Sequence, residues 1–323
     1  MEGILMRGPA GSFVSLRLPD GSIETYEKKI KPLKERFKPF GWPLIRGVAG
    51  FIESMIFGYR CLMESAEKTM PDMQGHQENE SKFDRWLTEH FGAKMLSVIG
   101  VVSGILGFAL AFGLFFWLPS FLFDTINHAA GDVIDGKWRA LIEGGVRIII
   151  FIAYMFLVSK MKDVKRLFMY HGAEHKSIFC FENGEALTTE NISKHKRFHP
   201  RCGTSFIFVI IIISILLSSV LALRFPALTA IRPLWILVKL SLAPLIIGLG
   251  YEFIRYAGRH NNIIVKVFAA PGLWMQRITT AEPSDDIIEV GAAALKAALY
   301  GLDNPSVETS EEKQEEALPE KTT

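Results

Sequence analysis

Four of the chain's eight histidines lie between His171 and His199. His171 and His175 are four residues apart, so a helix through this segment places both imidazoles on one face, where they can bind one metal ion. Glu174 lies near the same face and can act as a general base on a metal-bound water. The resulting H-x-x-E-H pattern reverses the H-E-x-x-H pattern and occurs in some zinc peptidases. The spacing therefore predicts a divalent-metal site, with zinc as the expected ion.

A second group of metal-binding residue types follows closely, at His195, His199 and Cys202. A catalytic zinc ion keeps three protein ligands and one open position, whereas a structural zinc ion uses four. We expect His171, His175 and His199 to bind the ion and Cys202 to be a fourth ligand or a neighbour. Cys202 precedes the expected start of a helix, whose N-terminus favours the thiolate. The competing interpretation is that these histidines are solvated loop residues facing lipid phosphates.

The elements that must position these residues include several apolar blocks. Residues 95–123 contain no charge, and neither do residues 202–223. About 20 helical residues cross the roughly 30 Å hydrocarbon core of a bilayer, so both blocks are long enough to span it. Residues 141–159 and 233–251 are weaker candidates because they contain Glu143, Arg147 and Lys239. The sequence predicts four spans, and the alternative for the weaker pair is buried helices of a soluble domain.

Lysine and arginine counts predict the orientation of these spans. Fourteen precede the first block, three lie in 119–147, nine in 160–203, two in 224–232, and seven follow from Arg255 onward. Cytoplasmic loops carry the excess of these residues. We therefore expect a multi-pass protein of the bacterial inner (cell) membrane, with both termini and the histidine-rich loop 160–203 in the cytoplasm.

Composition narrows the class of protein further. The chain has 323 residues, a net charge of +2 and three cysteines. Three cysteines do not provide a disulfide framework, and near-neutrality gives no sign of a nucleic-acid partner. Residues 303–323 carry seven acids and two lysines, a net charge of −5, so the remainder carries +7. We expect this acidic tail to be disordered and the partners to be the lipid bilayer and other membrane proteins.

The fold class we predict is mainly α, a polytopic helical membrane protein with a small N-terminal β-hairpin. Residues 1–38 form the hairpin region, with strands in 12–30 around a turn at Pro19–Gly21. Residues 39–80 hold an amphipathic helix over 44–67 and a polar linker. Residues 81–260 form the four-span domain, 261–302 a cytoplasmic segment with a short helix over 286–300, and 303–323 the tail.

Two features of this organisation allow alternatives. The helix over 44–67 can lie in the membrane interface, pack on the spanning helices, or be a core helix of a cytoplasmic domain. Glu252 and Arg255 are three residues apart, and we expect them to form an ion pair with each other; Glu252 as a metal ligand or substrate contact is the alternative. Cys61 and Cys180 are more typical of buried thiols than of ligands.

Many stretches of the chain resemble, in order, the bacterial DUF1385 or YqhQ-like family. They include EGILMRGP, RLPDGSI, YHGAEHKSI, HPRCGTSF, YEFIRYAGRHNN and PGLWMQRITTAEP, and they extend from Glu2 almost to Tyr300. The resemblance implies an integral membrane protein of a family often labelled as predicted metal-dependent enzymes. It supplies no reaction.

Two functional hypotheses follow. The first is a membrane-embedded metal-dependent enzyme, with a hydrolase as the expected type, that acts at its cytoplasmic side on a membrane-associated substrate. The second is a non-enzymatic membrane protein that assists biogenesis or scaffolds a partner, with a structural metal site or none. A transporter is less consistent with the sequence, which contains no repeated half and no pair of broken helices.

Overall fold

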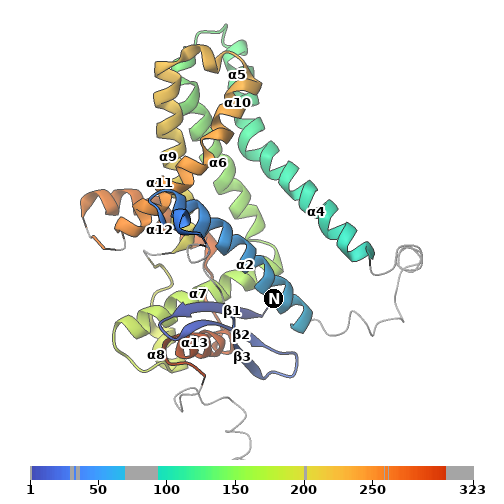
Figure 1. Ribbon diagram of the computed structural model, residues 1–323, viewed down its shortest axis with the longest axis vertical. Helices are drawn as coiled ribbons and strands as arrows, with labels where there is room; N and C mark the ends of the chain where they lie inside the picture. The colour runs from blue at the N-terminus through green and yellow to red at the C-terminus, as the bar shows by residue number, and fades with distance from the viewer. Residues whose placement is uncertain are drawn as a thin grey trace, which may run out of the picture. The chain divides into compact units, whose positions relative to one another are not determined.

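The structure, a computed structural model, describes residues 2–29, 33, 37–69, 94–199, 202–257, 259–260 and 262–302 (Figure 1). The predicted linker over 71–81 and the acidic tail lie outside these residues. The chain divides into two compact units. The first comprises Met1–Met70, Met155–Val209 and Ile247–Thr323, and the second comprises Pro71–Tyr154 and Ile210–Ile246.

The first unit contains a three-stranded antiparallel sheet at the N-terminus. Strands β1 (Gly3–Gly8), β2 (Gly11–Arg17) and β3 (Ile23–Glu27) pair in sequence order, with Leu5 opposite Val14 and Ser15 opposite Thr25. The predicted hairpin corresponds to β2 and β3, and Gly21 has a φ of +89° in its turn. The prediction missed β1, because its six residues begin and end with glycine and show too little alternation to indicate a strand.

The sheet packs against α13 (Asp285–Tyr300), which also contacts α7 (Lys162–Glu182) and the short α8 (Thr189–Lys194). We expected α13 to be a short amphipathic helix. It is instead buried on most sides, including Ile287, Val290, Ala294 and Ala298. Small residues allow this close packing: a Cβ at Gly291 would lie 2.9 Å from Ser177 Oγ of α7. The core of the first unit therefore joins the beginning, the middle and the end of the chain.

The first unit also contains α2 (Ile45–Thr69), preceded by a 3₁₀ turn (Lys38–Gly41), and α12 (Ile263–Thr279). Arg46 of α2 forms a two-point ion pair with Glu252. The expected pairing of Glu252 with Arg255 is thus wrong: the guanidinium of Arg46 reaches both carboxylate oxygens in the planar geometry that favours such pairs. The alternative role of Glu252 as a metal ligand receives no support from this arrangement.

The apolar side of α2 is exposed, with Ile52, Met55, Ile56, Tyr59 and Met63 all at least 47% accessible. The charged residues Glu64 and Lys68 pair with Lys28 and Glu24, which lie after and within β3. A core helix of a soluble domain would cover its apolar side, so this arrangement favours the membrane-interface alternative for α2 over the core alternative.

Three helices are long and apolar enough to cross a membrane: Val102–Ala129, Gly136–Val158 and Phe206–Arg224. The first joins α4 (Lys94–Phe112), a π-helical turn (Gly113–Trp117) and α5 (Leu118–Ala129). The second joins a 3₁₀ turn (Gly136–Trp138) to α6 (Arg139–Val158), and the third lies within α9 (Gly203–Arg224).

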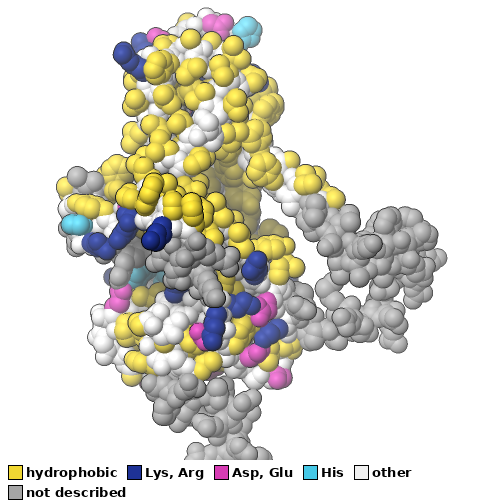
Figure 2. Space-filling view, viewed as in Figure 1, with side chains coloured by type: hydrophobic (Ala, Val, Ile, Leu, Met, Phe, Trp, Pro, Cys, Tyr) yellow, Lys and Arg dark blue, Asp and Glu magenta, His cyan; other side chains and the backbone are white. Residues whose placement is uncertain are grey.

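The fourth predicted span is a pair of helices rather than one. It follows a 3₁₀ turn (Pro226–Thr229) and comprises α10 (Arg232–Ser241) and α11 (Ala243–Ala257), which are bent by 43° at Leu242. The side chains on the visible faces of α6, α9 and α10 are mostly hydrophobic (Figure 2). Helices with apolar side chains exposed all round are typical of a lipid environment.

Candidate metal centre

Helix α7 has two faces with different roles. Tyr170, Ala173, Ser177 and Cys180 recur at helical spacing, are buried, and form the face that packs into the core of the first unit. On an adjacent face lie His171, His175, Ile178 and Glu182, which follow one another at intervals of three or four residues. These residues line a cavity of about 550 Å³ together with Glu174, His199, Cys202, Gly203 and Ile207. One helix thus anchors the core and presents the histidines.

Each of the two α7 histidines is held through one ring nitrogen. Nδ1 of His171 lies 2.8 Å from the carbonyl oxygen of Thr279, and Nδ1 of His175 lies 2.6 Å from that of Arg197. A carbonyl oxygen only accepts, so Nδ1 carries a proton in both rings, and Nε2 is the nitrogen left to bind a metal ion. This is the arrangement by which proteins orient histidines that bind metals.

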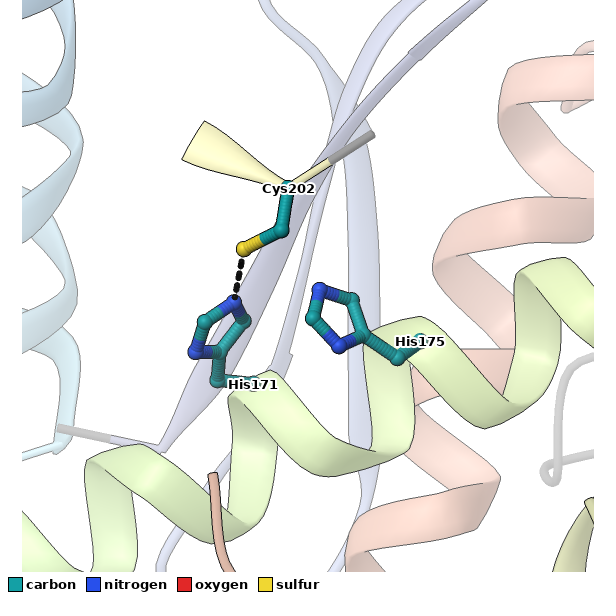
Figure 3. A group of neighbouring side chains, drawn as sticks. All are labelled: His171, His175 and Cys202. Carbon is teal, nitrogen blue, oxygen red and sulfur yellow. Dashed lines mark hydrogen bonds between the residues drawn. The ribbon is translucent and has the colours of Figure 1, made fainter. Parts of the chain in front are cut away.

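Cys202 completes a group of three potential ligands, as Figure 3 shows. Its Sγ lies 3.1 Å from His171 Nε2, and the ligand atoms of His171, His175 and Cys202 lie within 4.8 Å of one another. Cys202 directly precedes α9, as expected from the sequence. Imidazole nitrogen and cysteine sulfur are both donors that bind zinc in proteins, so the three residues are candidate ligands of one metal ion.

His199 lies in the same cavity but outside this group. Its ring centroid is 5.6 Å from that of His175, and its Nε2 is 3.6 Å from a carboxylate oxygen of Glu182. Gln276 of α12 fixes the backbone of His199 by accepting from its N–H and donating to its carbonyl. We expected His199 as the third ligand and Cys202 as the fourth; the geometry reverses their order, because Cys202 is adjacent to His171.

His195 lies with Glu185 and Cys180, away from the cavity. Its Nε2 is 3.2 Å from Glu185, and its Nδ1 is 3.3 Å from the side-chain amide of Asn183. Burial raises the pKa of the Cys180 thiol, which donates to the carbonyl of Ala186. A protonated thiol is a poor metal ligand. We therefore interpret this second group as one that fixes the loop after α7.

Two carboxylates face the cavity. Burial raises the pKa of Glu174, and the neighbouring His171 opposes that shift only in part. Glu182 also lines the cavity, although we did not predict it as a site residue. The signal was present, since Glu182 lies seven residues after His175 and thus shares its face of α7. The cavity therefore combines potential metal ligands with two groups that can accept a proton.

The segment between α12 and α13 supplies the Thr279 carbonyl and lies directly on α7. The N–H of Ala281 donates to the carbonyl of Phe168, and a Cβ at Gly172 would lie only 2.2 Å from the oxygen of Ala281. Lys176 and Arg197 both pair with Glu282, and although burial opposes it, these hydrogen bonds hold the pKa of that carboxyl below its ordinary value. Gly172 therefore permits the close approach that orients His171.

Most of the chain matches one protein family. The family model described as "Protein of unknown function (DUF1385)" matches residues 42–300. The chain belongs to this family. It is similar to "Uncharacterized protein YqhQ" of Bacillus subtilis (strain 168), with 30% identity over 312 residues, covering 93% of this chain and 90% of the relative. The family match includes every residue that lines the cavity. No solved structure matches the chain.

The contact at Gly172 gives a test of the packing that orients the site. Gly172→Ala would force a Cβ into the Ala281 carbonyl, so we expect a loss of about 1–3 kcal/mol in unfolding free energy, as for other overpacked sites. Thermal unfolding of the detergent-purified protein measures this loss. Gly58→Ala in α2 is the matched control, because its Cβ meets nothing within 4 Å, and we expect it to be neutral or stabilising. Equal behaviour of the two variants would contradict the close approach.

Proposed function

We propose that this protein is a multi-pass membrane protein that binds one zinc ion through His171, His175 and Cys202 and uses it to hydrolyse a membrane-associated substrate. One observation carries the proposal: two imidazole Nε2 atoms and one thiol sulfur converge at a cavity, and both imidazoles are oriented through Nδ1 by backbone carbonyls. Both termini and the cavity lie on the cytoplasmic side in this proposal, as the distribution of lysine and arginine indicates.

The donor set supports catalysis rather than a closed structural site. Three protein ligands would leave one position of a tetrahedral zinc ion open, and the ion would lower the pKa of a water bound at that position to about 7. Glu174 and Glu182 line the same cavity and can receive the proton of that water. His199 lines the same cavity, and its backbone is held by Gln276.

The remaining cavity wall suggests the class of substrate. Ile178 and Ile207 give the cavity an apolar side, and Gly203 and Ile207 belong to the first turns of α9. The candidate span within α9 begins at Phe206. A cavity that shares residues with the end of a membrane span is accessible to a substrate held at the bilayer surface. This supports a peptide or lipid-linked group over a freely soluble substrate.

Metal content is the decisive measurement. We expect about one zinc ion per chain in the detergent-purified wild type and a loss of most of it in His171→Ala and Cys202→Ser, because each change removes one of three ligands. His195→Ala is the matched control, since that imidazole pairs with Glu185 outside the cavity, and it should retain the metal. Elemental analysis of the four proteins gives the answer. A wild type without stoichiometric metal would refute the proposal.

A substitution of Glu174 tests whether this carboxylate is needed for metal binding or folding. We expect Glu174→Gln to keep the zinc ion and to leave the melting temperature unchanged or raise it, because the change removes a carboxylate from a partly buried position that folding does not require. Glu190→Gln, at an exposed carboxylate of α8, is the control. Loss of metal, or a fall of several degrees in melting temperature specific to Glu174→Gln, would contradict the proposed role of Glu174 as a proton acceptor and assign it to metal binding or folding.

The orientation can be tested by cysteine labelling in intact cells. We expect Val133→Cys, at a position 75% exposed between α5 and α6, to react with a membrane-impermeant maleimide from outside. Lys194→Cys, at an exposed position of α8, should react only after permeabilisation. The wild type is a suitable background because its three cysteines are buried. Labelling of Lys194→Cys in intact cells would overturn the proposed topology.

A further inference from the structure

Five charged side chains of the second unit form a chain of alternating ion pairs. Asp124 joins Arg232 at 2.6 Å to Arg139 at 3.0 Å, and Glu143 joins Arg139 at 2.8 Å to Lys239 at 2.6 Å. This series of ion pairs has a cation at each end, Arg232 and Lys239. Three cations and two carboxylates leave it with one unbalanced positive charge.

Within this series of ion pairs, both carboxylate oxygens of Glu143 are fully used by donors of the protein. Glu143 also accepts hydrogen bonds from Ser120 and from the indole N–H of Trp235, and its side chain is only 2% exposed. Arg139 donates in addition to the carbonyl of Thr229. These partners compensate for the burial of Glu143, so the positive surplus is not balanced further at that carboxylate.

A further cation lies close to the same network. Arg147 donates from Nε to the carbonyl of Phe115, which belongs to the π-helical turn. A π turn shifts the hydrogen-bond pattern of the helix and makes such a carbonyl available. Among the residues that the structure describes, no carboxylate lies within ion-pair distance of Arg147. The ion-pair series and Arg147 together therefore carry a net charge of +2.

At Arg232, the outermost member of this series of ion pairs, lies a cavity of about 680 Å³. Asp124, Arg139 and Arg232 line it on the polar side, and Trp117, Leu237 and Leu240 are among its apolar residues. Arg232 uses Nε for Asp124, and its two terminal amino groups have no hydrogen-bond partner within the described part of the chain. The cavity thus offers two guanidinium donors beside an apolar wall that continues along the exposed side of α10.

We propose that this cavity binds one phosphate-bearing anionic lipid. Its phosphate accepts hydrogen bonds from the terminal amino groups of Arg232, and its acyl chain lies along Trp117, Leu237 and Leu240. A guanidinium provides paired donors for phosphate oxygens, and the anion balances a charge that is otherwise expensive at membrane depth. The volume lies within the range of about 300–1,000 Å³ that is typical of small-molecule sites. This proposal uses the membrane location of the second unit and is independent of the zinc site.

Native mass spectrometry of the full-length protein in detergent tests the proposal, with phosphatidylglycerol, phosphatidylcholine and inorganic phosphate as probes. We expect the wild type to retain one phosphatidylglycerol with an affinity at least tenfold higher than for phosphatidylcholine. Arg232→Gln should lose this preference. Arg224→Gln is the matched control, because it removes the same charge from an exposed position at the end of α9 that does not line the cavity.

A second variant guards against misfolding of Arg232→Gln. Leu237→Trp fills the apolar wall from an exposed position and leaves every ion pair intact, and we expect it to weaken phosphatidylglycerol binding at least tenfold. Equal binding of both lipids to the wild type, full retention of phosphatidylglycerol by Arg232→Gln, or its displacement by millimolar inorganic phosphate would overturn the proposal. Zinc content measured in the same samples should not change in Arg232→Gln, which separates this result from that of the metal site.

Discussion

The contact between α7 and the segment that follows α12 determines the geometry of the candidate metal centre. Gly172 lets the backbone at Ala281 approach α7, and this approach brings the carbonyl of Thr279 to Nδ1 of His171. Helix α13 also packs against α7, and its Gly291 lies next to Ser177. Small residues at these points thus serve the core and the orientation of the histidines together. In the first unit, α7 therefore both packs into the core and presents the histidines.

The interior of the second unit differs from that of the first because it contains buried charged side chains. Glu143 is surrounded by two cations, a hydroxyl and an indole N–H, so that each carboxylate oxygen has two donors. A half-satisfied network of this kind would be less favourable than an apolar core. Its arrangement links α5, α6 and α10 at defined positions, which apolar packing alone specifies less strictly.

The sequence predicted the elements better than their contacts. The four apolar blocks, the helix over 44–67 and the β2–β3 hairpin follow from composition and periodicity, and the helical spacing of His171 and His175 placed them on one face. The pairing of Arg46 with Glu252 was not predictable from spacing, because it joins residues that are 206 positions apart. The bend at Leu242 did have a signal in the sequence: Pro244 lies two residues after it, donates no backbone hydrogen bond and clashes with the carbonyl four residues earlier, but we predicted one continuous span over 233–251. The choice between His199 and Cys202 likewise depends on where a loop returns to α7.

The site draws its parts from segments that the ribosome makes at very different times. The Nδ1 partner of His171 comes from residue 279, and the core that supports α7 includes β1 at one end of the chain and α13 near the other. The N-terminal sheet must therefore wait for nearly the whole chain, including every candidate span, before it meets α13. Domains whose parts are contiguous can close during synthesis. Here the geometry of the candidate metal centre depends on residues up to Tyr300, so a chain that ends before α13 would lack the core that supports it.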